Sequence, residues 1–197
     1  MTKKQWFAKG AKSGIPISLG YFAVAIALGI SAKKAGISVL QASTTSLLIN
    51  ASAGEYAGFT VIASNGAYFE IALATLVANI RYLLMGCAMS QRLRPGTPLW
   101  QRMLMAFHLT DELFGIAIAR PGYLNPYYSF GAALTAAPPW AIGTMLGVIA
   151  GNMLPQRLVS AFSVALFGMF LAVIIPEGKK NKIVMATIAI SFALSLI

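Results

Sequence analysis

Charged residues, and acidic residues above all, are scarce in this sequence. Only five Asp and Glu stand against fifteen Lys and Arg among 197 residues, a formal net charge of +10. Charged residues make up 10% of the chain, whereas a soluble domain carries about 25%. Hydrophobic residues reach 58%, and the mean hydropathy is +0.74. These values exclude a disordered chain and an ordinary soluble enzyme, and they indicate a single integral-membrane domain over residues 1–197.

The basic residues lie in short clusters between apolar runs. This distribution fits anchoring at the surface of a lipid bilayer and disfavours nucleic-acid binding. The four lysines among the first twelve residues weakly favour a cytoplasmic N-terminus.

Several chemical signatures are absent as well. Cys87 is the single cysteine, so the chain can form no internal disulfide and no cysteine metal cluster. The sequence contains no G-x-x-x-x-G-K-[ST] phosphate loop, no G-x-S-x-G nucleophile motif and no H-E-x-x-H zinc motif. We therefore expect neither an enzyme nor a protein with a cofactor or metal.

Long apolar runs dominate what is present, and they predict an all-α, polytopic transmembrane helix bundle with about six to seven membrane segments. The candidate segments are 15–32, 39–63, 67–90, 103–119, 130–154, 157–175 and 183–197. The last run would measure about 22 Å as a helix, which is shorter than the ~30 Å apolar core of a bilayer. We therefore expect the sequence to be a C-terminally truncated form of a longer protein.

The segment 39–63 differs from the others because Gly54, Glu55 and Gly58 interrupt its middle. This composition predicts a broken helix, and irregular backbone at membrane depth is tolerated where it lines a cavity. The alternative is a kinked but continuous helix with a structural glutamate. Basic residues divide eight to six between the two sides both if the segment crosses and if it turns back, so its crossing number stays open.

A second polar group, Asn79 and Arg81, lies midway along the segment 67–90. Because an arginine keeps its charge at ordinary pH, Arg81 needs an anion. The candidates are Glu70, Asp111, Glu112 and the carboxylate of a substrate. The alternative to a substrate role is a permanent structural ion pair.

A third group combines the only histidine with two carboxylates. If one helix covers this region, His108 and Glu112 lie at positions i and i+4 and share a face. Together with Asp111 they would form a proton or ion-pair relay. The alternative is that Asp111 and Glu112 cap the start of a helix.

Gly143, Gly147 and Gly151 form a stripe of small residues at intervals of four. Such stripes let helices approach closely in lipid. The stripe predicts either packing within the chain or a docking face for another subunit.

Five short motifs, taken in order, resemble the AzlC-type branched-chain amino acid permease family, the large subunit of a two-component amino acid exporter. They are residues 52–58 (SAGEYAG), 79–85 (NIRYLLM), 109–112 (LTDE), 143–147 (GTMLG) and 151–155 (GNMLP). The similarity covers nearly the whole chain. Family members commonly carry Gln at the position of Glu55, and they usually continue beyond residue 197.

The resemblance implies a multi-pass protein of the cell inner membrane that exports valine, leucine, isoleucine or similar amino acids. It also implies a small, hydrophobic AzlD-type membrane subunit as partner. A zwitterionic amino acid needs one anionic and one cationic partner. We therefore expect the substrate-binding residues to be Gly54, Glu55, Tyr56, Asn79 and Arg81, beside Asp111 and Glu112. A channel or scaffold subunit that transports nothing itself is the alternative.

Overall fold

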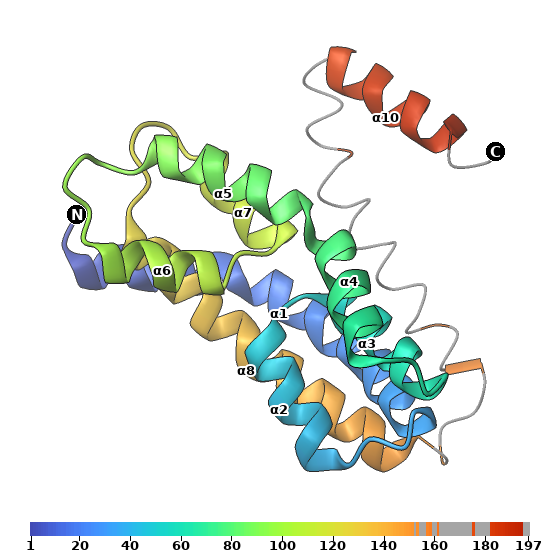
Figure 1. The fold of residues 1–197 in the computed structure, drawn as a ribbon. Helices are drawn as coiled ribbons and strands as arrows, with labels where there is room; N and C mark the ends of the chain where they lie inside the picture. The colour runs from blue at the N-terminus through green and yellow to red at the C-terminus, as the bar shows by residue number, and fades with distance from the viewer. Residues whose placement is uncertain (152, 154–156, 159–160, 162–174, 176–181, 195–197) are drawn as a thin grey trace.

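A computed structural model describes residues 1–151, 153, 157–158, 161, 175 and 182–194 of the chain. Apart from one isolated bridge between Leu93 and Leu124, its described regular structure is helical, which confirms the all-α class (Figure 1). The helices are α1 (Lys3–Lys34), α2 (Val39–Ile49), α3 (Ser52–Ala63), α4 (Tyr68–Asn79), α5 (Arg81–Arg92), α6 (Leu99–Phe107), α7 (Asp111–Ile118), α8 (Pro126–Ala150) and α10 (Lys182–Leu194).

Two long helices, α1 and α8, lie side by side and form the centre of the molecule (Figure 1). Their backbones approach so closely that only glycine fits at several contacts. A Cβ atom added to Gly14 would lie 2.8 Å from the carbonyl oxygen of Ala132, and one added to Gly143 would lie 2.6 Å from that of Phe22. Since lipid provides no hydrophobic drive between helices, this close packing is what holds the pair together.

The predicted break in segment 39–63 is confirmed. Helix α2 ends at Asn50, whose φ of 49° is left-handed, and α3 begins after Ala51 without a side-chain cap. Two further interruptions were not predicted. The pair α4 and α5 is bent by 47° at Ile80, and the segment 103–119 is broken at residues 108–110.

Helices α2 and α3 form a hairpin, because the start of α2 and the end of α3 both lie near the C-terminal end of α1. Phe59 near the end of α3 packs with Ala42 near the start of α2, and both join Ala32 of α1 and Val148 of α8. The segment 39–63 therefore enters the bundle and turns back at its break.

Helices α6 and α7 form a second hairpin, which enters from the opposite end of the bundle. The loops that flank it both lie beside the N-terminus, where the Arg92 side chain donates hydrogen bonds to the carbonyl oxygens of Arg120 at 2.6 Å and Gly122 at 2.8 Å. The Arg120 guanidinium in turn lies 5.0 Å from the centre of the Trp6 ring in α1. The tips of the two hairpins thus point toward each other.

The predicted number of six to seven segments is not confirmed. Two helices, α1 and α8, are long and apolar enough to cross a membrane, and the bent pair α4–α5 makes a third candidate. The segments 39–63 and 103–119 each turn back at a break instead of continuing to the other end. The segment 157–175 lies almost entirely outside the described residues, and α10 falls within the predicted run 183–197 apart from its first residue.

The hairpin arrangement predicts which loops share a side of the membrane. In a Cys87→Ser background, single cysteines at Lys34 and Ser64 should react with an impermeant thiol reagent from one side. Single cysteines at Gln91 and Tyr123 should react only from the other side. Labelling of intact and of permeabilised cells measures this, and labelling of positions 34 and 64 from opposite sides would contradict the α2–α3 hairpin.

Candidate functional site

The two hairpin tips meet at a small cavity in the middle of the bundle. Its lining comes from both tips, from the start of α5, and from the two central helices. The lining residues are Tyr21, Val24, Asn50, Ser52, Tyr82, Thr110, Asp111, Glu112 and Trp140. At about 20 Å³ the cavity has room for one water molecule. The cavity therefore has no room for a larger ligand in this structure, and we call this the closed arrangement.

Glu112 is held at the cavity by a hydroxyl group from α1. The Tyr21 hydroxyl lies 2.6 Å from Glu112 Oε2 and 2.5 Å from Thr110 Oγ1, and all three groups are buried. Thr110 also caps α7, because its side chain accepts a hydrogen bond from the Leu113 amide. The sequence Thr-Asp-Glu therefore starts a helix, as the capping alternative predicted, and it also presents Glu112 to the cavity.

Arg81 pairs with Asp111, which lines the same cavity. The shortest distance between the guanidinium and the carboxylate is 2.8 Å, and the two side chains keep 43% and 28% of their surface exposed. The Arg81 guanidinium also lies 5.5 Å from the centre of the Tyr82 ring. Of the anions proposed for Arg81, Asp111 is the one it contacts. Glu112 stands beside this pair without a cation of its own among the described residues.

Asn79 lies against Gly54 at the bend between α4 and α5. A Cβ atom at Gly54 would collide with the Asn79 amide group, so the glycine makes room for this contact between α3 and α4. Asn79 Oδ1 and Arg81 Nε are buried but have no hydrogen-bond partner. Buried polar atoms normally have a hydrogen-bond partner. These two atoms have none within the protein, so they are available to bind water or a ligand.

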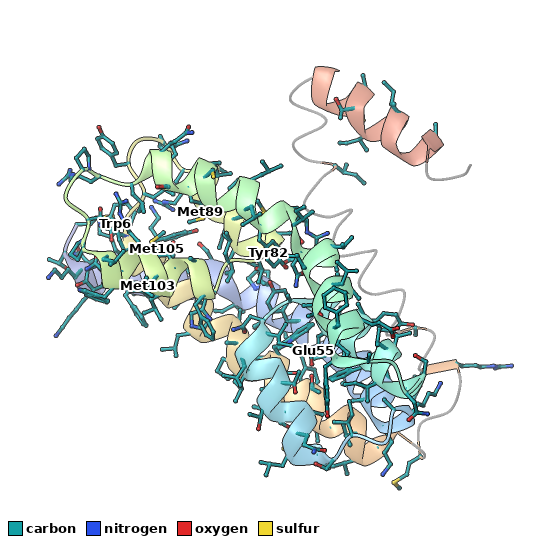
Figure 2. All side chains as sticks on the ribbon, in the orientation of Figure 1. Trp6, Glu55, Tyr82, Met89, Met103 and Met105 are labelled. Atoms are coloured by element: carbon teal, nitrogen blue, oxygen red, sulfur yellow. The ribbon has the colours of Figure 1, made fainter. Side chains whose placement is uncertain are left out.

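Glu55, which is labelled in Figure 2, does not line the cavity, and it is completely buried. Its carboxyl oxygens contact two side chains from other helices: Oε1 is hydrogen-bonded to the Ser46 hydroxyl, and Oε2 accepts a bond of 3.2 Å from Trp140 Nε1. The Ser46 hydroxyl also lies 2.7 Å from that of Thr144. Glu55 therefore joins α2, α3 and α8.

Trp140 connects the two polar groups. Its indole nitrogen binds Glu55, and its ring packs edge-on against Tyr21 with the ring centres 5.3 Å apart. Since the Tyr21 hydroxyl contacts Glu112, the two central helices place one aromatic residue against the carboxyl group of each hairpin.

The structure brings only part of the predicted site together. Asp111 and Glu112 line the cavity, Arg81 pairs with Asp111, and Gly54 and Asn79 contact each other. Tyr56 is 58% exposed and does not line the cavity.

The shared helix face of His108 and Glu112 is not present, because the break at residues 108–110 separates them. His108 lies beyond the end of α6, with its ring 4.8 Å from that of Phe107, and lines a separate pocket with Met105 and Ser129.

The predicted docking face of Gly143, Gly147 and Gly151 is already occupied. Gly143 and Gly147 face the α1 backbone, and Gly151 faces the Lys33 side chain at the end of α1. Packing within the chain therefore accounts for the stripe, and this face is not free for another subunit.

Sequence reasoning missed the partners that hold the carboxyl groups, namely Tyr21, Ser46, Trp140 and Thr144. A signal was available, since buried Tyr and Trp side chains generally bring a hydrogen-bond donor that needs a partner. Among the described residues no group of three or more His, Cys, Asp and Glu side chains is placed to hold a metal ion.

Apolar helices, two hairpins that meet inside the bundle and a small polar cavity define a polytopic helical membrane protein. The chain belongs to the AzlC family, because the family model described as "AzlC protein" matches residues 16–154. That range contains both hairpins and every residue of the cavity lining.

Relatives with membrane-protein names support this assignment. The chain is 27% identical to the inner membrane protein YgaZ of Escherichia coli over 96% of its own length and 80% of that protein. It is 28% identical to an uncharacterised membrane protein of Archaeoglobus fulgidus, over 93% of this chain and 81% of the relative. No solved structure matches the chain.

The contacts of Tyr21 predict that its hydroxyl stabilises the fold. Tyr21→Phe removes the group that satisfies both Glu112 and Thr110, and leaving such buried groups unpaired costs about 1 to 3 kcal/mol. We expect a lower midpoint of thermal unfolding in detergent. Tyr56→Phe is the matched control and should leave the midpoint unchanged, because this side chain is mostly exposed. Equal midpoints for the Tyr21→Phe variant and the unmodified protein would contradict the assigned role.

Proposed function

We propose that this chain is the large subunit of a transporter that exports branched-chain or other hydrophobic amino acids across the inner membrane. The supporting observation is the cavity between the tips of two opposed hairpins, which Asp111 and Glu112 line and where Arg81 pairs with Asp111. Polar and charged groups inside a membrane protein are costly and usually mark a transport path.

The charges at the cavity suit a zwitterionic amino acid. Arg81 is a planar donor that can bind a carboxylate through two hydrogen bonds. Asp111 and Glu112 supply two acceptors for an ammonium group. In the closed arrangement Arg81 and Asp111 form an ion pair at 2.8 Å. A bound substrate would replace it, with its carboxylate binding Arg81 and its ammonium group binding Asp111. An aliphatic side chain would then lie against Val24 and the aromatic lining.

Opening of the hairpins would supply the missing volume. A cavity of about 20 Å³ cannot hold an amino acid, so substrate entry needs one hairpin tip to move away. The α2–α3 and α6–α7 hairpins enter from opposite ends of α1. Movement of one or the other would open the cavity to one side of the membrane at a time, as alternating access requires.

The basic residues support an N-terminus in the cytoplasm. At the N-terminal end of the bundle lie Lys3, Lys4, Arg92, Arg94 and Arg120, whereas Lys33 and Lys34 lie at the other end. An excess of Lys and Arg on the cytoplasmic side is the general rule for membrane proteins. The name of the Escherichia coli relative likewise supports an inner-membrane location.

We further propose that a small hydrophobic AzlD-type subunit binds the outer surface of the bundle. Helix α4 has no buried residue and exposes large apolar side chains, which suit contact with lipid or with a hydrophobic helix. The alternative role as a scaffold without its own substrate is less well supported, because its expected assembly face is occupied by α1.

Loss of the Arg81 side chain should abolish transport. Arg81→Ala removes the cation for the substrate carboxylate and leaves Asp111 unpaired, so we expect no counterflow of labelled valine in proteoliposomes. Arg81→Lys should retain a small part of the rate, because lysine keeps the charge but lacks the planar pair of donors. Lys34→Ala is the control, since that residue is exposed at the end of α1. Normal counterflow in a correctly inserted Arg81→Ala protein would exclude this site.

The partner proposal predicts that efflux depends on both chains. Cells loaded with valine should export it when this chain and the small subunit are expressed together, and Arg81→Ala in this chain should stop the export. If the variant complex exports valine normally, then the partner carries transport and the scaffold alternative is correct.

A further inference from the structure

Glu55 is a buried carboxyl group that the proposed substrate cavity does not use. It has no exposed surface, it is absent from the cavity lining, and no Lys, Arg or His in the described part of the chain forms an ion pair with it. The side chains that contact its carboxyl group are Ser46 from α2 and Trp140 from α8. Tyr21 of α1 packs against the ring of Trp140.

Counting hydrogens around Glu55 shows that the closed arrangement accommodates a neutral acid. Ser46 and Thr144 each carry one hydroxyl hydrogen. If Thr144 Oγ1 donates to the carbonyl oxygen of Trp140, which lies 3.3 Å away, then the hydrogen between Ser46 and Thr144 comes from Ser46. In that arrangement the hydrogen between Ser46 and Glu55 comes from the carboxyl group. Every donor and acceptor of this chain is satisfied when Glu55 is a neutral acid.

The same side chains can also surround an ionised Glu55 if the hydroxyl groups of Ser46 and Thr144 rotate. Thr144 then donates to Ser46, and Ser46 donates to the carboxylate. That state buries a negative charge with two neutral donors and no cation, which is unfavourable in an apolar interior. The charged form therefore needs water, and water can reach Glu55 only if α2 and α3 move away from α8.

We infer that Glu55 is a proton-binding site, separate from the substrate cavity, whose proton enters and leaves when the α2–α3 hairpin parts from α8. The inference rests on the proposed function in one respect, because that hairpin movement is the one that would also open the cavity. The step moves one proton: water admitted by the opening gives it to the Glu55 carboxylate, and the acid returns it to water.

Trp140 is the group through which this proton would act on the substrate cavity. It contacts Glu55 through its indole nitrogen and Tyr21 through its ring, and Tyr21 contacts Glu112 in the other hairpin. The neutral acid lets the hairpin close against Trp140. The ionised form favours the open, hydrated arrangement, so proton binding and cavity closure favour each other.

Infrared spectroscopy tests the site without relying on transport. The full chain in lipid vesicles at neutral pH should show the carbonyl stretch of a protonated, buried carboxylic acid, and Glu55→Gln should remove it. Glu70→Gln is the matched control, because Glu70 is exposed at the start of α4 and should leave the band unchanged. Ser46→Ala keeps Glu55 but removes its hydroxyl partner, so the band should shift in frequency.

Transport measurements in the same vesicles test the coupling. Glu55→Gln should keep valine counterflow, which needs no net proton movement, and should lose valine accumulation driven by a pH gradient. A band that survives Glu55→Gln, a band that Ser46→Ala does not shift, or undiminished gradient-driven accumulation would each overturn the inference. If the unmodified protein shows no counterflow, the proposed function fails, whereas the infrared band still decides whether Glu55 holds a proton.

Discussion

The close contact between α1 and α8 is the constraint on which the centre of the molecule depends. Glycines on both helices let the backbones meet, and this fixes the relative position of the residues that each helix carries inward. Tyr21 and Trp140 consequently pack against each other, with their polar atoms directed to different hairpins. A bulkier residue at Gly143 or Gly147 would separate the helices, and it would therefore also separate the two aromatic partners that hold the hairpins.

The hairpin tips are stable inside the bundle because Tyr21 and Trp140 form hydrogen bonds with the polar groups of the two hairpins. A chain that turns back at membrane depth exposes backbone and side-chain polar groups that lipid cannot bind. At the tip of the α6–α7 hairpin Thr110 caps α7, and Tyr21 binds both Thr110 and Glu112. At the other tip, Glu55 attaches α3 to α2 and α8. The few carboxylates of the sequence therefore hold the fold together as well as forming the candidate site.

The sequence predicted the class of fold and the region of the site better than the number of crossings. Apolar composition is enough to indicate membrane helices, and the glycines around Glu55 were enough to indicate the break in segment 39–63. The break at residues 108–110 contains no glycine or proline, so its only signal was Thr110 followed by two acidic residues. Hydropathy cannot distinguish a hairpin from a span, because both must be apolar along their length.

Individual contacts in the site were predictable only in part. Arg81 had to find an anion, and the choice of Asp111 from several candidates depends on the bend at Ile80. The placement of Glu55 outside the cavity was not predictable, because it follows from the direction of α3 relative to Trp140. Residue types thus indicated which groups need partners, and the helix packing determined which partners they received.

The two hairpins use the same local pattern for different chemistry. In each one, a glutamate near the start of the second helix is followed three residues later by a glycine, as Glu55 and Gly58 in α3 and as Glu112 and Gly115 in α7. Each glutamate contacts an aromatic donor from a central helix. The difference lies in the neighbouring side chains, since Glu112 faces the cavity beside Arg81 and Asp111, whereas Glu55 faces only uncharged groups. A charged substrate can therefore compete for contacts with Glu112, but only a proton can enter the closed surroundings of Glu55.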